Sequence, residues 1–240
     1  MNAPYTELTP LKPVLRNDWR RKRLVVVSPS AAWGSLMTQD AAPQFDLMTY
    51  SYDGSAASPL CTGLPGFVGH EAMQTEMWGE SLFKLFGAIP AHYEVVLFLN
   101  SDIFISYAEI NKYFDYVDLF ALDISQPALS LNSFYSHQFL LKKTSIDVEP
   151  VPFVEVMMPC LSRAVIDELA RLGIYTISGW GMDEYLFQNV VERLGLRPQA
   201  VVHAVTALHT KPVESRGMVF SNGMSPQQER EQLEALCKRL

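Results

Sequence analysis

Short apolar segments that end abruptly in polar residues constrain the fold of this chain more than any other feature. Three of them are rich in β-branched and aromatic residues: RLVVVSPS from Arg23, FDLMTYSYDGS from Phe45 and YEVVLFLNSD from Tyr93. Runs of this kind, bounded by turn-forming residues, are typical of buried β-strands. We therefore expect strands near residues 23, 45 and 93, each followed by a loop at its carboxyl end.

A helix is expected between the second and third of these strands. After the Gly/Pro-rich loop CTGLPGFVGH, residues 71–86 place Met73, Met77 and Leu82 at helical spacing. Strands that alternate with helices are the signature of an α/β fold with a doubly wound, mostly parallel sheet flanked by helices. The chain has 240 residues, 48% of them hydrophobic, which suits a single domain.

The second half of the chain continues the pattern. A strand is expected in DLFALDISQPAL, a helix after the capping residue Ser162, a helix after ISGWGMDE that stops at Gly195, and a strand in AVVHAVTALHT. SPQQ, from Ser225, predicts a capping box and a final helix. The expected organisation is an N-terminal arm at 1–22, a folded domain at 23–220 and a C-terminal helix at 221–240.

Composition excludes several classes of protein. The net charge of -7 argues against general nucleic-acid binding, which needs a basic surface. Three widely spaced cysteines indicate neither a disulfide framework nor a cysteine zinc site. The chain has no apolar run of the roughly 18 residues that span a bilayer and no apolar leader, so we expect a soluble, cytoplasmic protein. The segment RNDWRRKR is a local exception. Its reading as a solvated arm is favoured over peripheral contact with anionic lipid or an anionic partner.

The expected strand ends carry polar side chains. Parallel sheets bind ligands beyond the carboxyl ends of their strands, where this chain has Ser28 and Ser30, then Asp53, then Asn100 and Asp102. Neither GxGxxG after the first strand nor GxxxxGK[ST] is present, so the usual phosphate cradles are missing. A divalent metal held by Asp102 would neutralise a phosphate instead, because such metals need only one or two protein carboxylates. The alternative is that Asp102 is an ordinary turn residue.

The loop GWGMDE is the second candidate. Glycines on both sides of Trp180 allow the backbone and the indole face to approach a flat ligand closely, and Asp183 next to it is suited to take a proton from a hydroxyl. The competing interpretation is that Asp183 only caps the following helix.

Two histidines six residues apart on the last expected strand are the third candidate. Their even spacing places them on one face of an extended strand, where two histidines are able to bind a metal. For His203 a structural role with hydrogen-bonded ring nitrogens is favoured. His209 stands at the strand end, close to the cation Lys211, and is the better candidate for a metal or phosphate site.

Residues from about 23 to 213 resemble the glycosyltransferase-like family catalogued as domain of unknown function 707. The matching segments are FDLMTYSYDGS, EVVLFLNSDIFIS, LDISQPALS followed by SHQ, FVEVMMPCLSR, GWGMDEY and VVHAVTALHTKP. The resemblance implies a GT-A-like (Rossmann-like) domain over residues 23–220. It also implies that the ligand is a nucleoside-diphosphate sugar and the cofactor Mn2+ or Mg2+.

The same resemblance implies roles for individual residues. Asp102 is the last position of the metal-binding acidic motif, whose first two positions are usually acids but are Asn100 and Ser101 here. His209 matches the histidine that completes the metal site, and the position that this family usually fills with an acid in its VVD segment is His203. The remaining implied roles are a general base at Asp183, a nucleoside contact at Asp53, a sugar platform at Trp180, a phosphate contact at Lys211, and an acceptor side lined by Glu155 and His137.

These inferences predict an inverting, metal-assisted glycosyltransferase whose acceptor is a glycan, a lipid-linked molecule or a small molecule. One alternative is a catalytically silent GT-A-like module that binds nucleotide sugars or glycans, which the reduced NSD motif favours. A phosphoester hydrolase ranks last, because we find no second carboxylate cluster to hold the paired metals that such enzymes often use.

Overall fold

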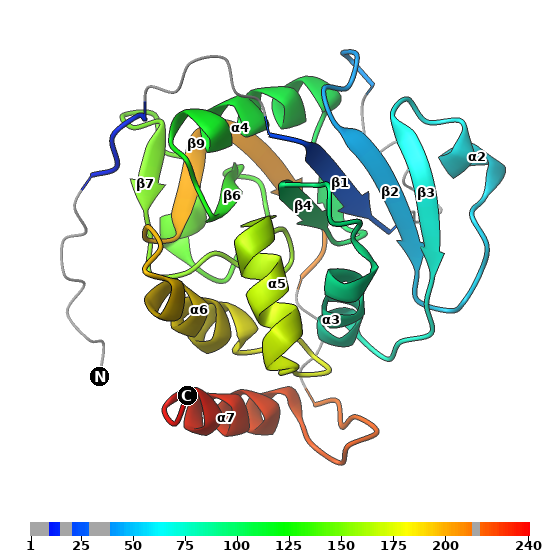
Figure 1. Ribbon diagram of the computed structural model, residues 1–240, viewed down its shortest axis with the longest axis vertical. Coiled ribbons are helices and arrows are strands. Elements are labelled where there is room, and N and C mark those ends of the chain that lie inside the picture. The colour runs from blue at the N-terminus through cyan, green and yellow to red at the C-terminus, as the bar shows by residue number, and fades with distance from the viewer. Residues whose placement is uncertain (1–9, 15–20, 29–38, 213–216) are drawn as a thin grey trace.

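The computed structural model describes residues 10–14, 21–28, 39–212 and 217–240. In these residues a nine-stranded sheet has the strand order β3-β2-β1-β4-β8-β6-β9-β5, and β7 also pairs with β9. Helices cover both of its faces (Figure 1). Phe45 packs edge-on against Tyr107 of α4, whereas Tyr50 packs against Trp78 of α3, which places these two helices on opposite faces of the sheet. The expected α/β class with a central sheet and flanking helices is confirmed.

The N-terminal half of the sheet is entirely parallel. It consists of β1 (Arg23–Val27), β2 (Asp46–Ser51), β3 (Phe67–Ala72) and β4 (Val95–Leu99). Every residue of β1 and β4 is buried, as expected for strands that are covered on both faces. The strands predicted near residues 23, 45 and 93 are therefore confirmed.

The helix predicted over residues 71–86 is only partly correct. Residues up to Ala72 belong to β3, and α3 (Trp78–Ala88) begins six residues later. β3 is an edge strand with half-exposed side chains and a register shift opposite Leu47 and Met48. Its apolar pattern is consequently weak, and the sequence interpretation treated it as loop.

The second half of the sheet mixes strand directions. Its strands are β5 (Ile103–Phe104), β6 (Ile124–Leu129), β7 (Val148–Pro150), β8 (Cys160–Ser162) and β9 (Ala200–His209). β8 lies antiparallel between β4 and β6, and β5 and β7 are antiparallel to β9, whereas β6 and β9 are parallel. The expected strands in DLFALDISQPAL and AVVHAVTALHT correspond to β6 and β9.

The helices follow most of the expected signals. They are α2 (Pro59–Thr62), α3, α4 (Tyr107–Leu119), α5 (Arg163–Leu172), α6 (Phe187–Leu194) and α7 (Pro226–Cys237), with a 3-10 turn at Gln138–Leu140 and a π-helical turn at Met182–Leu186. The capping box of Ser225 and Gln228 forms, and α6 stops at Gly195, whose φ is 61°. Ser162 stands at the N-cap position of α5 as predicted, although its side chain makes no capping hydrogen bond within the described residues.

Two arginines at the end of the basic segment form ion pairs within the folded domain. Arg21 binds Asp118 and the backbone carbonyls of Val117 and Leu122 at the end of α4, and Arg23 binds Asp115 and Asp118. Cations are favourable at a helix C-terminus. These two arginines are therefore not available to a lipid surface, whereas Arg16, Arg20 and also Ser30 lie outside the described residues.

Among the described residues, no helix combines the length and the apolar character that crossing a membrane requires. The three cysteines are free thiols, in agreement with the expectation that they form no disulfide framework.

Candidate functional site

Asp102 and His209 meet where β4 and β9 end. After Leu99 the chain turns through Asn100–Asp102 into β5, and β5 pairs with the end of β9, where Ile103 is opposite His209. The Asp102 carbonyl accepts hydrogen bonds from the amide and the hydroxyl of Thr210. These contacts hold Asp102 Oδ2 3.3 Å from His209 Nε2.

The hydrogen bonds of His209 define its protonation. Nδ1 lies 3.0 Å from the Phe134 carbonyl, which only accepts, so Nδ1 carries a hydrogen and Nε2 faces the Asp102 carboxylate. Burial alone would lower the pKa of His209, but the Asp102 carboxylate raises it overall. Two acceptors placed this close require a cation between them, either a proton on Nε2 or a metal ion.

The donor set fits a divalent cation. Asp102 Oδ1 is buried and has no hydrogen-bond partner among the described residues, although its twin oxygen contacts His209. Carboxylate oxygens suit Mn2+ and Mg2+, imidazole is a common ligand of divalent transition metals, and one or two protein ligands suffice when phosphates and water supply the others. Nowhere in the described chain do three or more His, Cys, Asp or Glu side chains cluster closely enough to hold a metal.

Glu155 interacts electrostatically with both His209 and Asp183. Its amide donates to Gln126 Oε1, and its side chain is 8% exposed with Oε2 unpartnered in the described part of the chain. Burial raises the pKa of Glu155 to about 7, the charge of Asp183 adds to this, and His209 opposes it. The pKa of Glu155, the predicted acceptor-side residue, therefore depends on the charges of Asp183, the predicted base, and His209, a predicted metal ligand.

Asp183 occupies the π-helical turn that precedes α6. Its Oδ1 accepts from the Glu184 amide and its Oδ2 from the Val156 amide, at 2.9 and 3.3 Å. Burial raises the pKa of Asp183 to about 7, although these two amide hydrogen bonds lower it. The N-cap position belongs to Gly181, so Asp183 is not the helix cap that the competing interpretation assumed. Single π-helical turns are frequent at functional sites.

The glycines around Trp180 have a structural reason that differs from the expected one. Gly179 and Gly181 have φ values of 87° and 83°, a conformation that side chains rarely adopt. Gly79 of α3 lies so close that a Cβ there would fall 2.2 Å from the Gly179 nitrogen. Backbone geometry and helix contact thus account for both glycines without a ligand. Trp180 itself is half-buried.

Two tyrosines near the end of β2 form hydrogen bonds beside the candidate site, and the sequence analysis did not identify them. The Tyr52 hydroxyl donates to Asn100 Oδ1 and lies 3.1 Å from the Tyr50 hydroxyl. Asn100 Oδ1 also accepts from the Ser101 amide, so Asn100 ties β2 to the turn that carries Asp102. Tyr50 and Tyr52 read as ordinary apolar strand residues, and only their spacing of two, which puts both on one face, gave a signal.

The remaining predicted residues differ in their surroundings. Asp53 is exposed after β2, and hydrogen bonds from Ser55 lower its pKa. Lys211 is exposed just beyond His209. His137 packs edge-on against Phe153, and burial lowers its pKa while Glu184 opposes this effect. His203 has the structural role that was favoured, since it is fully buried and contacts Glu149 through Nε2.

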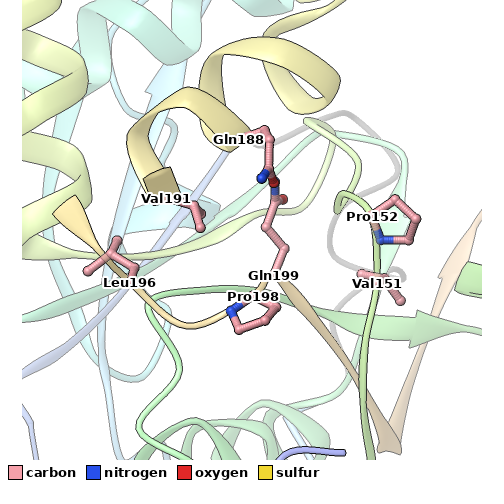
Figure 2. A pocket seen from close by; sticks show the side chains of 7 residues that line it. All are labelled: Val151, Pro152, Gln188, Val191, Leu196, Pro198 and Gln199. Carbon is pink, nitrogen blue, oxygen red and sulfur yellow. The ribbon is translucent and has the colours of Figure 1, made fainter. Parts of the chain in front are cut away.

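A cavity of about 360 Å³ lies elsewhere (Figure 2). It is lined by residues from 151–152, α6 and the segment 196–199, which leads into β9. His209 ends the same strand that this segment begins, so the cavity is at the other end of β9 from Asp102 and contains no predicted site residue.

The fold is similar to that of several solved glycosyltransferases. S. aureus TarS in complex with UDP-GlcNAc aligns over 80% of this chain and 59% of its own, with a TM-score of 0.53 and 16% identity. The mannosyltransferase PcManGT from Pyrobaculum calidifontis, in complex with GDP-Man and Mn2+, aligns over 87% and 62%, with a TM-score of 0.53 and 10% identity.

GalNAc-T7 with UDP, GalNAc and Mn2+ aligns over 86% of this chain and 46% of its own, with a TM-score of 0.55 and 12% identity. The chain thus spans roughly half to two thirds of the length of these proteins. No family model and no curated protein matches the sequence, so the resemblance to domain of unknown function 707 stays a prediction. The likenesses give the chain a fold of the GT-A glycosyltransferase type.

Proposed function

We propose that the protein is a glycosyltransferase that moves a sugar from a nucleoside-diphosphate donor to an acceptor hydroxyl with inversion at the anomeric carbon. The observation that carries this proposal is the contact of Asp102 with His209 at the strand ends of a GT-A-type fold, with Glu155 in electrostatic reach of both His209 and Asp183. Two of these carboxylates have a buried oxygen without a partner among the described residues, an arrangement that costs stability and is therefore expected where a ligand binds.

Asp102 and His209 would hold Mn2+ or Mg2+. When bound there, the ion supplies positive charge that stabilises the negative charge gathered by the leaving diphosphate. PcManGT and GalNAc-T7 were each solved with Mn2+, which is consistent with this assignment. Asn100 and Ser101, which replace the usual acids, would contact the donor, with Asp53 on the nucleoside side and Lys211 on the phosphates.

Asp183 would be the general base. As the acceptor oxygen forms its bond to the anomeric carbon, its hydroxyl proton passes to the Asp183 carboxylate and the bond to the diphosphate breaks. A pKa of about 7 matches this task, since a base works best when its pKa is near the working pH. The second buried carboxyl, Glu155, would line the acceptor side with His137, and Trp180 would form a sugar platform.

Acceptor and location belong to the same proposal. A glycan end, a lipid-linked molecule or a small metabolite all provide the required hydroxyl, and we place the reaction in the cytoplasm. Hexosyl transfer is the expected reaction.

The proposal is tested by thermal unfolding of the protein with UDP, GDP and their sugar conjugates, each with and without Mn2+. A bound ligand raises apparent stability by mass action, by about 2.7 kcal/mol at a hundredfold excess over Kd. We expect one nucleotide to raise Tm only with Mn2+, and Asp102→Asn to abolish the increase. The matched control is Asp167→Asn, which removes an exposed carboxylate on α5.

Released nucleotide is then measured with the donor so identified. Turnover with Mn2+ that stops on addition of a chelator would support transfer chemistry. A Mn2+-dependent shift without any donor turnover, in the presence of diverse sugar acceptors, would favour a silent binding module. Equal shifts in wild type and Asp102→Asn would contradict the metal assignment.

A further inference from the structure

Glu229 is a buried carboxylate that the mechanism above does not use. It lies in the first turn of α7 and is 2% exposed. Oε1 accepts from the Ile177 amide and the Asn222 side chain, at 2.9 and 2.8 Å. Oε2 accepts from the amide and the hydroxyl of Ser178, at 2.9 and 2.6 Å. All four contacts come from donors, and three of them belong to two successive residues of one loop.

That loop leads directly to Asp183. The Ser178 hydroxyl, besides donating to Glu229, accepts from the Trp180 amide, and the Met182 amide donates to the Gly179 carbonyl. The hydrogen bonds of Glu229 are therefore relayed along the chain to the residue next to the proposed base. Charge-assisted hydrogen bonds are about twice as strong as neutral ones, so Glu229 is well suited to fix this backbone.

The same helix also contacts the loop beyond Asp183. Arg230 binds Glu184 at 2.7 Å and lies over the ring of Tyr185, with 5.3 Å from the guanidinium carbon to the ring centroid. On the other side of the loop, the Glu80 amide at the start of α3 donates to the Ile177 carbonyl. Residues 176–185 thus contact α3 on one side and α7 on the other. Figure 1 shows α7 beneath α5 and α6.

We propose that Glu229 is a positioning residue, which fixes the loop of residues 176–182 and thereby sets the placement of Asp183. The inference rests on the proposed function for the catalytic meaning of Asp183, whereas the contacts between Glu229 and the loop stand without it. It assigns to α7 a part in the reaction, through the loop that carries Asp183.

The first experiment compares Glu229→Gln with wild type by hydrogen–deuterium exchange in the full chain. The matched control is Glu231→Gln, which changes an exposed glutamate of the same helix that accepts a hydrogen bond from Gln227. We expect the amides of Ile177 and Ser178 to exchange at least about tenfold faster in Glu229→Gln, which corresponds to a loss of about 1.4 kcal/mol. Peptides of β1 and β4 should be unchanged in both variants. Unchanged exchange at residues 177–182 would overturn the proposal.

The second experiment separates positioning from simple stability. The carboxyl carbon of Asp183 is titrated by NMR in wild type and Glu229→Gln, because a displaced carboxyl admits water and loses part of its raised pKa. The expected change is a fall of about one pH unit or more. An unchanged titration together with faster exchange would mean that Glu229 only stabilises the loop, which contradicts the proposed role.

A milder variant keeps the test decisive if Glu229→Gln does not fold. Ser178→Ala removes the hydroxyl that donates to Glu229 and accepts from the Trp180 amide, and it leaves the two amide bonds to Glu229 in place. It should show the same effects at smaller size. With the donor in hand, both variants should lower kcat at least about tenfold while the donor KM stays within about threefold, since only the placement of the base changes. If wild type shows no transfer, the proposed function fails while exchange and titration still decide the role of Glu229.

Discussion

β9 carries two histidines six residues apart, and their surroundings are opposite. His203 Nδ1 accepts from the Lys143 amide, so Nε2 carries the hydrogen and donates to Glu149, which also binds the Lys143 ammonium. His209 has its hydrogen on Nδ1 and directs Nε2 at a carboxylate with an unpartnered oxygen. Burial lowers the pKa of His203 despite Glu149, whereas Asp102 raises that of His209 against burial.

This contrast teaches that pairing, rather than residue type or spacing, separates a structural histidine from a candidate ligand. The cluster of His203, Glu149 and Lys143 satisfies its ring nitrogens and its charge within the protein. The cluster at the other end of β9 leaves oxygens of Asp102 and Glu155 unpartnered among the described residues. The four predictions below test this difference.

The largest expected effect separates the two clusters by activity. Asp183→Asn should lower kcat by roughly 100- to 10,000-fold, the contribution of a well-placed base, with the donor KM within about threefold. Glu149→Gln removes a carboxylate from the His203 cluster and should leave kcat within about threefold while it lowers Tm. Steady-state kinetics with Mn2+ at saturation measure both. Comparable losses of kcat in the two variants would break the distinction.

The two histidines should differ next in metal binding. His209→Gln should weaken Mn2+ binding by about 10- to 100-fold, because it removes one of the two protein ligands that we propose. His203→Gln should leave Mn2+ affinity unchanged and destabilise the fold by about 1–3 kcal/mol, since the hydrogen bonds of a buried group are disturbed. Titration calorimetry and urea unfolding provide the readouts. Unaltered Mn2+ affinity in His209→Gln would contradict the ligand assignment.

Stability should depend on pH through Glu155 and Asp183. Both carboxyls have a folded pKa of about 7, above the ordinary values of 4.5 and 3.8. Their contribution to stability is therefore fully present below about pH 4 and is lost as pH rises through about 7. Asp183→Asn should match wild type near pH 4 and exceed it at pH 8, by on the order of 2 kcal/mol in urea unfolding.

The exposed variant Asp167→Asn should show no such crossover between the two pH values. A constant difference between Asp183→Asn and wild type at every pH would mean that the Asp183 carboxyl is ionised in the folded protein throughout this range.

The smallest effect tests whether an unpartnered atom always marks a ligand site. The Ser162 hydroxyl is buried without a partner in the described residues, yet it stands at the start of α5, and no predicted site residue contacts it. Ser162→Ala should leave kcat unchanged and change stability by less than about 1 kcal/mol, because no hydrogen bond is lost. A large loss of activity would extend the candidate site to α5.

Local signals predicted the parts of this molecule that depend on neighbours in sequence. The strand β4, which ends at Leu99 just before the turn with Asp102, the stop at Gly195 and the capping box at Ser225 all follow from residue types within a few positions. The edge strand β3 was missed because its side chains are half exposed and its pattern is weak. Because β3 was missed, the helix was predicted to begin at residue 71, whereas α3 begins at Trp78.

Interactions between residues that are far apart in the sequence could not be predicted from local patterns. The bond from Ser178 to Glu229 joins positions 51 residues apart, and the contact of Asp102 with His209 joins positions 107 apart. The resemblance suggested the second pair, but no periodicity indicates the first. Gly179 and Gly181 illustrate a different limit, since the sequence showed the two glycines but not the positive φ that each of them adopts.

Gly79 has a consequence for anyone who redesigns this protein. Because its backbone touches that of residues 176–179 directly, an alanine there would require the helix or the loop to move by more than an ångström, since ordinary contacts begin near 3.4 Å. If the proposed function holds, a library intended to change sugar specificity should therefore hold position 79 constant and vary the exposed residues near Asp53 and Lys211 instead. Substitution at position 79 would alter the spacing between α3 and the loop of residues 176–179, and every variant built on it would carry that change.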